Sequence, residues 1–239
     1  MVKFEDVLAA DRFRPSDYTA ALVRCILQHG DWAREADVLD IGCGSGVLLA
    51  AAGSAGAARL CGVDIEPQAV AAAATLLEGL GHAPRLELHE GEMFAPVAGR
   101  QFDLVLANLP HFPMDTAAVD GRLASWSAGG ADGRKLVDRF VDGLAAHLAP
   151  GGHALLMHND FIGLDQTHRA AARQGLTVAV AEAIMVPLPK AKLAVMTPEV
   201  LQRETGLSIH RFGDYAFGTV SVLVIARQAG AVPASGGRA

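Results

Sequence analysis

The chain has 239 residues, of which 51% are hydrophobic and 19% charged, and its formal net charge is −6. These values predict one globular α/β domain with a buried core, and they exclude an intrinsically disordered chain. The acidic balance and the lack of a lysine- or arginine-rich run count against nucleic acid as a partner, because basic side chains supply much of the affinity for a phosphate backbone.

The cysteines and the lengths of the apolar runs indicate in which cell compartment the protein is expected. Cys25, Cys43 and Cys61 form no C-x-x-C pair and no metal-ligand spacing, so we expect reduced, structural thiols and no bound metal. The N-terminus lacks the apolar core of a signal peptide, and no apolar run approaches the roughly 18 residues that span a bilayer. The sequence therefore predicts a soluble, cytoplasmic protein without membrane contact.

The first 36 residues predict a helical N-terminal extension, in which Asp17 is a candidate cap and Gly30 ends the helix. From Val38 apolar runs alternate with helical patterns, which is typical of a parallel, doubly wound sheet. We expect this main domain to cover 37–228. The expected strands are 38–41, 59–63, 85–89, 104–107 and 154–157, and the expected helices are 47–53, 67–80, 134–148 and 163–174.

The end of the chain departs from this alternation. Residues 176–186 and 218–226 predict two further strands, and between them lies an insertion, 187–215, with a short helix expected at 198–205. Such a long excursion at a sheet edge is often a lid or a substrate-recognition element, and an inert packed insertion is the alternative. The Gly/Ala/Ser/Pro-rich tail, 229–239, is predicted to be disordered.

A glycine-rich turn follows the first predicted strand. The sequence VLDIGCGSGV places Asp40 before Gly42, Gly44 and Gly46, and glycine lets the backbone approach a ligand closely. A carboxylate at the start of this loop would repel a pyrophosphate and suits a cationic ligand. The pattern resembles motif I of class I S-adenosylmethionine (SAM) methyltransferases. The alternatives are a NAD-type cofactor and a glycine-rich turn without a ligand.

This resemblance implies that SAM is the cofactor and that the glycine loop holds it together with Asp40. It implies that Asp64, after the second strand, accepts the two ribose hydroxyls, with Ile65 beside it. Glu92 and Met93, after the third strand, would then lie next to the adenine ring. Asn108, after the fourth strand, would emerge beside the cofactor, because ligands of open α/β sheets lie outside the carboxyl ends of the strands.

The fourth strand runs into the tetrad Asn108-Leu109-Pro110-His111. It resembles the N-P-P-Y motif of methyltransferases that act on planar amide or aromatic amino nitrogens. The resemblance implies that the Asn108 side-chain oxygen and the Leu109 carbonyl accept hydrogen bonds from the target NH₂ and so orient its lone pair. It also implies that His111 stacks on the target. Leu109 replaces a proline that would fix φ, and His111 can titrate or donate.

Two segments, one before the glycine loop and one after the tetrad, point to one branch of the methyltransferases. FRPS-x-x-T at 13–19 and ASWSAGGADGR at 124–134 are similar to segments of the HemK-type glutamine N5-methyltransferases of protein release factors, in their short form. The likeness covers about residues 12–186. It implies the class I methyltransferase fold: a Rossmann-like α/β domain with a seven-stranded, mostly parallel sheet and an antiparallel last strand. His158, Asn159 and Asp160 follow the fifth strand, where a helix N-cap is expected more than a substrate contact.

The leading interpretation is a SAM-dependent N-methyltransferase that acts on an amide or similar nitrogen of a small molecule or a protein side chain. The altered tetrad favours a small substrate with a carboxylate or other hydrogen-bonding group near His111, and then activity should follow an ionisation near neutral pH. The alternatives are a methyltransferase of nucleic-acid bases and a non-catalytic SAM-binding subunit. A homodimer or a small partner subunit is compatible with either enzyme.

Overall fold

The computed structural model describes residues 16–114 and 127–227. The expectations for residues 1–15, for the first part of the 124–134 segment and for the tail lie outside the described residues. Within the described part of the chain, no helix is long and apolar enough to cross a membrane.

The fold is built on one twisted sheet with the strand order β3-β2-β1-β4-β5-β8-β6, and a short strand β7 pairs with β8 off this path. The pairs among β1 to β5 are parallel, and β8 is antiparallel to β5, β6 and β7. This confirms the predicted parallel sheet with an antiparallel last strand and adds β7, which was not predicted. The strands are β1 (Asp37–Ile41), β2 (Arg59–Asp64), β3 (Leu86–Glu90), β4 (Phe102–Ala107), β5 (Leu148–Asn159), β6 (Leu176–Pro187), β7 (Ile209–Phe212) and β8 (Tyr215–Arg227).

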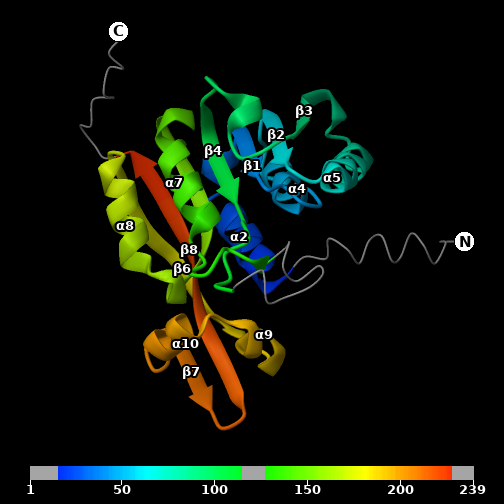
Figure 1. Cartoon of the computed structure of the whole chain (residues 1–239). Coiled ribbons are helices and arrows are strands. Elements are labelled where there is room, and N and C mark those ends of the chain that lie inside the picture. The colour runs from blue at the N-terminus through cyan, green and yellow to red at the C-terminus, as the bar shows by residue number, and fades with distance from the viewer. Residues whose placement is uncertain (1–15, 115–126, 228–239) are drawn as a thin grey trace, which may run out of the picture.

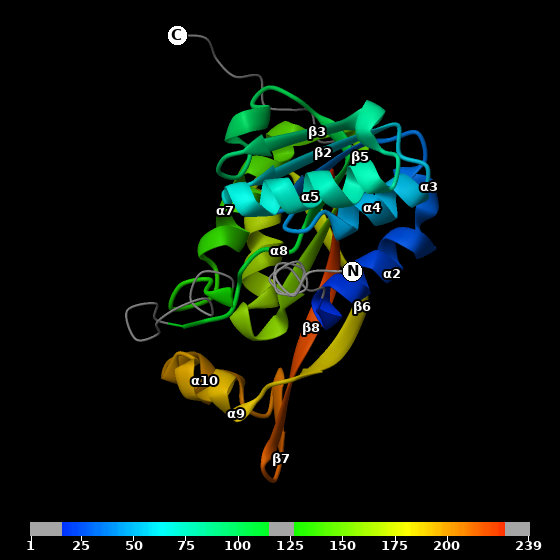
Figure 2. The same ribbon diagram turned by 90° about the vertical axis from the view of Figure 1, so that its right-hand side faces the viewer.

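Helices cover both faces of the sheet (Figures 1 and 2). Alternate residues of a strand point to opposite faces, and in β1 Leu39 belongs to one buried core and Val38 to the other. The Leu39 core packs against α7 (Lys135–His147) and α8 (Leu164–Arg173). The Val38 core packs against α2 (Asp17–Gln28), α3 (Gly30–Ala33), α4 (Val47–Ser54) and α5 (Pro67–Gly79). Short 3-10 turns lie at Ala83–Arg85, Ala95–Val97 and Asp160–Ile162.

Two local predictions are corrected. The N-cap of α2 is Ser16 and not Asp17, because the Ser16 N–H donates to Thr19 Oγ1 (3.4 Å) and Asp17 already lies in the first turn. The fifth strand, expected at 154–157, begins already at Leu148, directly after α7 ends at His147, so Pro150, Gly151 and Gly152 lie inside the strand. Gly151 has φ +80° there, and the register with β4 shifts, which is the signature of a bulge.

The insertion lies beyond the carboxyl ends of the parallel strands. β6 and β8 run past the rest of the sheet to α9 (Lys190–Val195), α10 (Pro198–Glu204) and β7, as Figure 2 shows. Helix α10 matches the predicted short helix, and α9 was not predicted. The Thr197 N–H donates to the Pro113 carbonyl (3.0 Å), which ties the insertion to the segment after the tetrad.

Candidate active site

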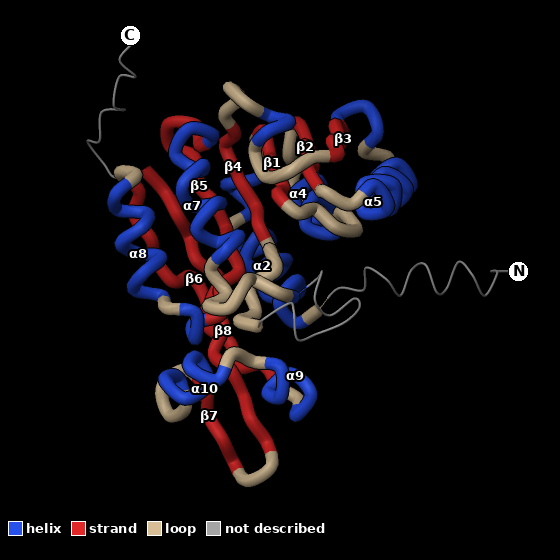
Figure 3. The backbone as a smooth tube through the Cα atoms, viewed as in Figure 1, coloured by secondary structure: helices blue, strands red, loops and turns tan. Residues whose placement is uncertain are grey.

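A cavity of about 690 Å³ lies where the loops after β1, β2, β3 and β4 meet. Its volume is within the range of small-molecule sites. The lining contains predicted cofactor and tetrad residues: Gly42, Gly44, Asp64, Ile65, Glu92, Met93, Asn108, Leu109, Pro110 and His111. The fold thus brings together side chains from four separate loops, and Figure 3 shows the loop after β4 close to the start of α2.

The three glycines of the loop have different surroundings. Each has a positive φ, between 52° and 79°, which favours glycine. A Cβ at Gly44 would meet nothing within 4 Å, so the backbone there is open to the cavity, whereas a Cβ at Gly42 would lie 3.1 Å from a Leu109 methyl group. A Cβ at Gly46 would lie 3.1 Å from Ala73 of α5. Gly46 is therefore needed for helix packing and lies outside the cavity lining.

Asp40 is fully buried near the end of β1, and neither carboxyl oxygen has a hydrogen-bond partner among residues 16–114 and 127–227. Burial, followed by the nearby charge of Asp64, raises the pKa of Asp40 to about 8. Asp40 does not itself line the cavity. A buried carboxyl without a donor is costly when it is ionised, and a cationic ligand bound in the neighbouring cavity would reduce that cost. SAM carries a sulfonium and an ammonium group, both positively charged. A loop that begins with a buried carboxyl therefore suits SAM better than a negatively charged pyrophosphate.

Asp64 connects two of the cavity loops. One carboxylate oxygen accepts the Gly44 N–H and the other accepts the Glu66 N–H, each at 2.9 Å. Each carboxylate oxygen has a second lone pair, so these bonds fix the side chain and still leave acceptor capacity for ribose hydroxyls. Ile65 follows with 64% of its surface exposed at the rim. The ribose role itself stays a prediction.

Glu92 is held by Arg139 of α7, a cavity residue that the sequence did not reveal. This hydrogen-bonded ion pair lowers the pKa of Glu92. Met93 has φ +52°, one of two non-glycine residues with positive φ among those described. A left-handed methionine is uncommon and is found where surrounding structure imposes it, here in the cavity wall. The adenine contacts expected for both residues stay predictions.

The amide of Asn108 is oriented from the N-terminal helix. Its Nδ2 donates to Thr19 Oγ1 at 3.3 Å across 89 positions of sequence. Thr19 is also the acceptor that caps α2 through Ser16. No described residue donates to Asn108 Oδ1, so this acceptor is available in the cavity. Thr19 is the threonine of the FRPS-x-x-T segment, but sequence patterns could not show that it contacts Asn108.

His111 is buried, and its ring contacts the tetrad itself. The Nδ1 atom bonds to the Leu109 carbonyl, which can only accept, so Nδ1 carries the proton and Nε2 is an unpaired acceptor. Burial lowers the pKa of His111 to about 4. The near-neutral ionisation predicted for His111 is therefore wrong. The ring is buried before any substrate binds, and Tyr18 packs edge-on against it at 5.9 Å.

Asn159 supports the tetrad from β5. Its Nδ2 donates to the His111 carbonyl (3.2 Å), and its Oδ1 accepts the Tyr18 hydroxyl (3.0 Å). Asn159 occupies the N-cap position of a 3-10 turn, as expected, but without a side-chain capping bond. Its amide connects α2 to the tetrad instead. Burial raises the pKa of the Tyr18 phenol, which stays protonated.

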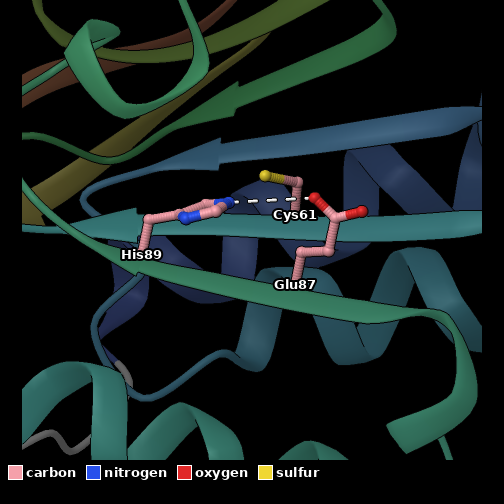
Figure 4. A group of neighbouring side chains, drawn as sticks. All are labelled: Cys61, Glu87 and His89. Atoms are coloured by element: carbon pink, nitrogen blue, oxygen red, sulfur yellow. Dashed lines mark ion pairs between the residues drawn. The ribbon is translucent and has the colours of Figure 1, made fainter.

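A second cluster, outside the cavity, joins Cys61, Glu87 and His89 on β2 and β3, with candidate ligand atoms within 4.8 Å of one another (Figure 4). Strand pairing creates this juxtaposition, which sequence spacing could not reveal. A cation is already present: Arg100 Nη1 lies 2.7 Å from Glu87 Oε2 and 4.0 Å from the Cys61 sulfur. Burial raises the pKa of Cys61 to about 11, so the thiol is protonated. In this structure Glu87 of the cluster is thus paired with Arg100.

Comparison with known proteins agrees with this geometry. The family model for ribosomal protein L11 methyltransferase (PrmA) matches residues 19–114, which include the glycine loop and the tetrad. A putative protein N5-glutamine methyltransferase of Methanocaldococcus jannaschii is 29% identical over 73% of this chain and 86% of its own length. The release factor glutamine methyltransferase of Moorella thermoacetica is 33% identical over 64% of this chain. The match covers 54% of that bacterial relative, or about half its length.

Solved structures show the same fold. A chain of the E. cuniculi Mtq2-Trm112 complex superposes with a TM-score of 0.57 at 16% identity, and the match covers 90% of this chain and 98% of that chain. The fold is thus shared with this structure. The chain is a class I SAM-dependent methyltransferase related to the release factor glutamine methyltransferases.

Proposed function

We propose that the chain transfers the methyl group of SAM to the nitrogen of a primary carboxamide, such as a glutamine side chain. The observation that carries this proposal is the orientation of Asn108. Thr19 accepts a hydrogen bond from its NH₂ group, which leaves the side-chain oxygen as an acceptor in the cavity. An acceptor is the group needed to bind the N–H of a carboxamide.

The chemistry of an amide explains why two acceptors are useful. The nitrogen lone pair is delocalised into the carbonyl group, so a free amide is a weak nucleophile. Asn108 Oδ1 and the Leu109 carbonyl would each accept one N–H of the target, which fixes the nitrogen and polarises it toward the methyl group. The Leu109 carbonyl also accepts from His111, but a carbonyl has two lone pairs. SAM would supply the electrophilic methyl group when bound. As the N–CH₃ bond forms, the S–CH₃ bond would break, S-adenosylhomocysteine would leave, and one amide proton would pass to solvent.

The sequence relatives support glutamine as the amide. Several are described as glutamine methyltransferases of release factors, and the archaeal relative as a putative protein N5-glutamine methyltransferase. The Mtq2-Trm112 structure is described as a complex responsible for methylation of the eRF1 termination factor. We therefore include a protein substrate and a small partner subunit in the proposal, beside a small-molecule amide.

The test is methyl transfer from labelled SAM to a glutamine-containing peptide and to N-acetyl-L-glutamine, with tandem mass spectrometry to locate the methyl group. The proposal predicts one methyl group on the side-chain nitrogen, formed by the wild type and lost in Asn108→Ala. Methylation of a nucleic-acid base instead would contradict it. SAM binding without turnover on any amide, alone or with a co-purified partner, would identify a non-catalytic subunit.

A further inference from the structure

The cavity wall beyond the tetrad carries an ammonium group that the proposed reaction does not use. Lys192, on α9 of the insertion, lines the cavity together with Asn108 and His111. Its Nζ lies 5.5 Å from the centre of the Phe112 ring and 5.9 Å from that of Tyr18. These distances are within the range of cation–π contacts. The ammonium is thus held between two aromatic faces at the cavity wall.

The charge of Lys192 has no carboxylate partner. Within residues 16–114 and 127–227, ion pairs join Lys190 to Asp214 at 3.2 Å and Arg139 to Glu92, but none includes Lys192. The side chain is half-buried, and burial lowers its pKa. A partly desolvated ammonium that contacts only aromatic rings still gains from a nearby anion. An anion bound in the cavity would therefore be stabilised at this position.

The neighbouring groups limit the kind of anion. His111 contributes no charge, because it is neutral above about pH 5. Two other cations line the cavity: Arg139 is paired with Glu92, and Lys135 is exposed at the start of α7. Lys192 is the half-buried one, and its Nζ lies over the ring of Phe112, the residue after the tetrad. One lysine suits a single negative charge. A phosphate, with its higher charge, is usually bound by several cations or by a helix N-terminus.

We propose that Lys192 binds a carboxylate of the methyl acceptor, so that the enzyme selects a carboxamide carrying a carboxylate in the same molecule. This inference rests on the proposed function and names its substrate class. It also gives the insertion a role: α9 contributes the specificity-determining side chain, and Thr197 fixes α9 to the segment after the tetrad.

The test uses two probes with the same carboxamide: N-acetyl-L-glutamine and its neutral methyl ester. We expect the wild type to prefer the acid in kcat/KM by about tenfold or more, the size of a charged hydrogen bond. Lys192→Met should remove this preference and Lys192→Arg should retain much of it. Lys190→Met is the matched control on the same helix, because its ammonium pairs with Asp214 outside the cavity, and it should behave like the wild type.

Equal kcat/KM for the acid and the ester in the wild type would overturn the inference and leave the proposed function standing. It would also fall if Lys192→Met weakened the binding of S-adenosylhomocysteine, because the lysine would then hold the cofactor carboxylate. If neither probe is methylated, calorimetry of the acid with the S-adenosylhomocysteine complex decides. The carboxylate site is supported if the acid binds to the wild type, the ester does not, and Lys192→Met abolishes binding of the acid. The site is refuted if the acid does not bind to the wild type.

Discussion

Asp40 should make cofactor binding release a proton. The carboxyl is fully buried without a hydrogen-bond donor, and its pKa is about 8 in the protein without cofactor. SAM carries positive charge and therefore binds the ionised carboxylate more tightly than the protonated one. Binding should pull the proton off, and the affinity for SAM should rise with pH until Asp40 is ionised in the free protein as well.

The size of the effect follows from the pKa. One pH unit below it, about nine tenths of the molecules hold the proton, so at pH 7 binding should release up to about 0.9 proton. Near pH 9 the release should fall to about 0.1 proton. Between pH 6 and 7 the dissociation constant should drop by up to about tenfold. These figures are upper limits, because they assume full ionisation of Asp40 in the complex.

The same shift affects stability in the absence of SAM. The folded pKa of about 8 lies above the ordinary carboxyl pKa of 3.8. The folded state therefore binds more protons than the unfolded state between these values, and the free energy of unfolding falls as pH rises through this window. At about 1.4 kcal/mol per unit, the cost at pH 7 is on the order of 4 kcal/mol. Asp40→Asn should flatten this slope and weaken SAM binding.

Calorimetry of SAM binding in two buffers with different ionisation enthalpies, at pH 7 and at pH 9, measures the released protons. Asp40→Asn should remove the release. Asp37→Asn, on the same strand but paired with Arg59, is the matched control and should retain it. Equal proton release by the wild type and Asp40→Asn, or none in either, would refute the argument.

Three further predictions concern orientation, packing and titration. Thr19→Val should lower kcat by about tenfold, on the scale of one hydrogen bond, because the Asn108 amide loses its acceptor, and Thr19→Ser should restore the rate. Steady-state kinetics measures both, and an unchanged kcat in Thr19→Val would contradict the role of Thr19 in orienting Asn108. Gly152→Ala should destabilise the fold by about 1–3 kcal/mol in urea denaturation, because its Cβ would meet three backbone oxygens at 2.9 to 3.0 Å. Gly79→Ala, with open space around it, should be neutral or stabilising, and equal effects of the two would oppose the packing argument. Because the pKa of His111 is lowered, the folded state binds fewer protons than the unfolded state below pH 6.5, so the free energy of unfolding should fall from pH 6.5 toward 4. His111→Tyr should reduce this fall in urea denaturation, and an unchanged dependence of stability on pH would indicate that the ring titrates normally.

The parallel sheet was predictable because each strand is a local apolar run between turn residues. β1 and β2 were found within one residue of their ends, and the glycine loop identified the ligand edge. The bulge in β5 was missed because strand pairing with β4, and not the Pro-Gly-Gly sequence, decides where the extended chain begins. β7 was missed because four residues are too few for a periodic signal and its pairing with β8 is tertiary.

The site was predictable where the chemistry lies in one contiguous motif. Asp40 and the Asn108 tetrad belong to such motifs. The burial of His111 was not predictable, because Tyr18 and Asn159, which enclose it, come from distant segments. Lys192 lies in the predicted insertion 187–215, but the packing of α9 against Phe112, which brings its ammonium to the cavity, is tertiary and leaves no pattern in the sequence.

The most direct test of the central claim is single-turnover methylation of N-acetyl-L-glutamine by the wild type and Asn108→Ala, at saturating SAM. Removing one preorganised polar contact at a reacting centre typically lowers the rate by about 100-fold or more. We expect a loss of this size, with the SAM dissociation constant changed by less than about twofold, because the lost bond serves the reacting nitrogen. Methylation at the wild-type rate by Asn108→Ala would contradict the assignment of this site to carboxamide methylation.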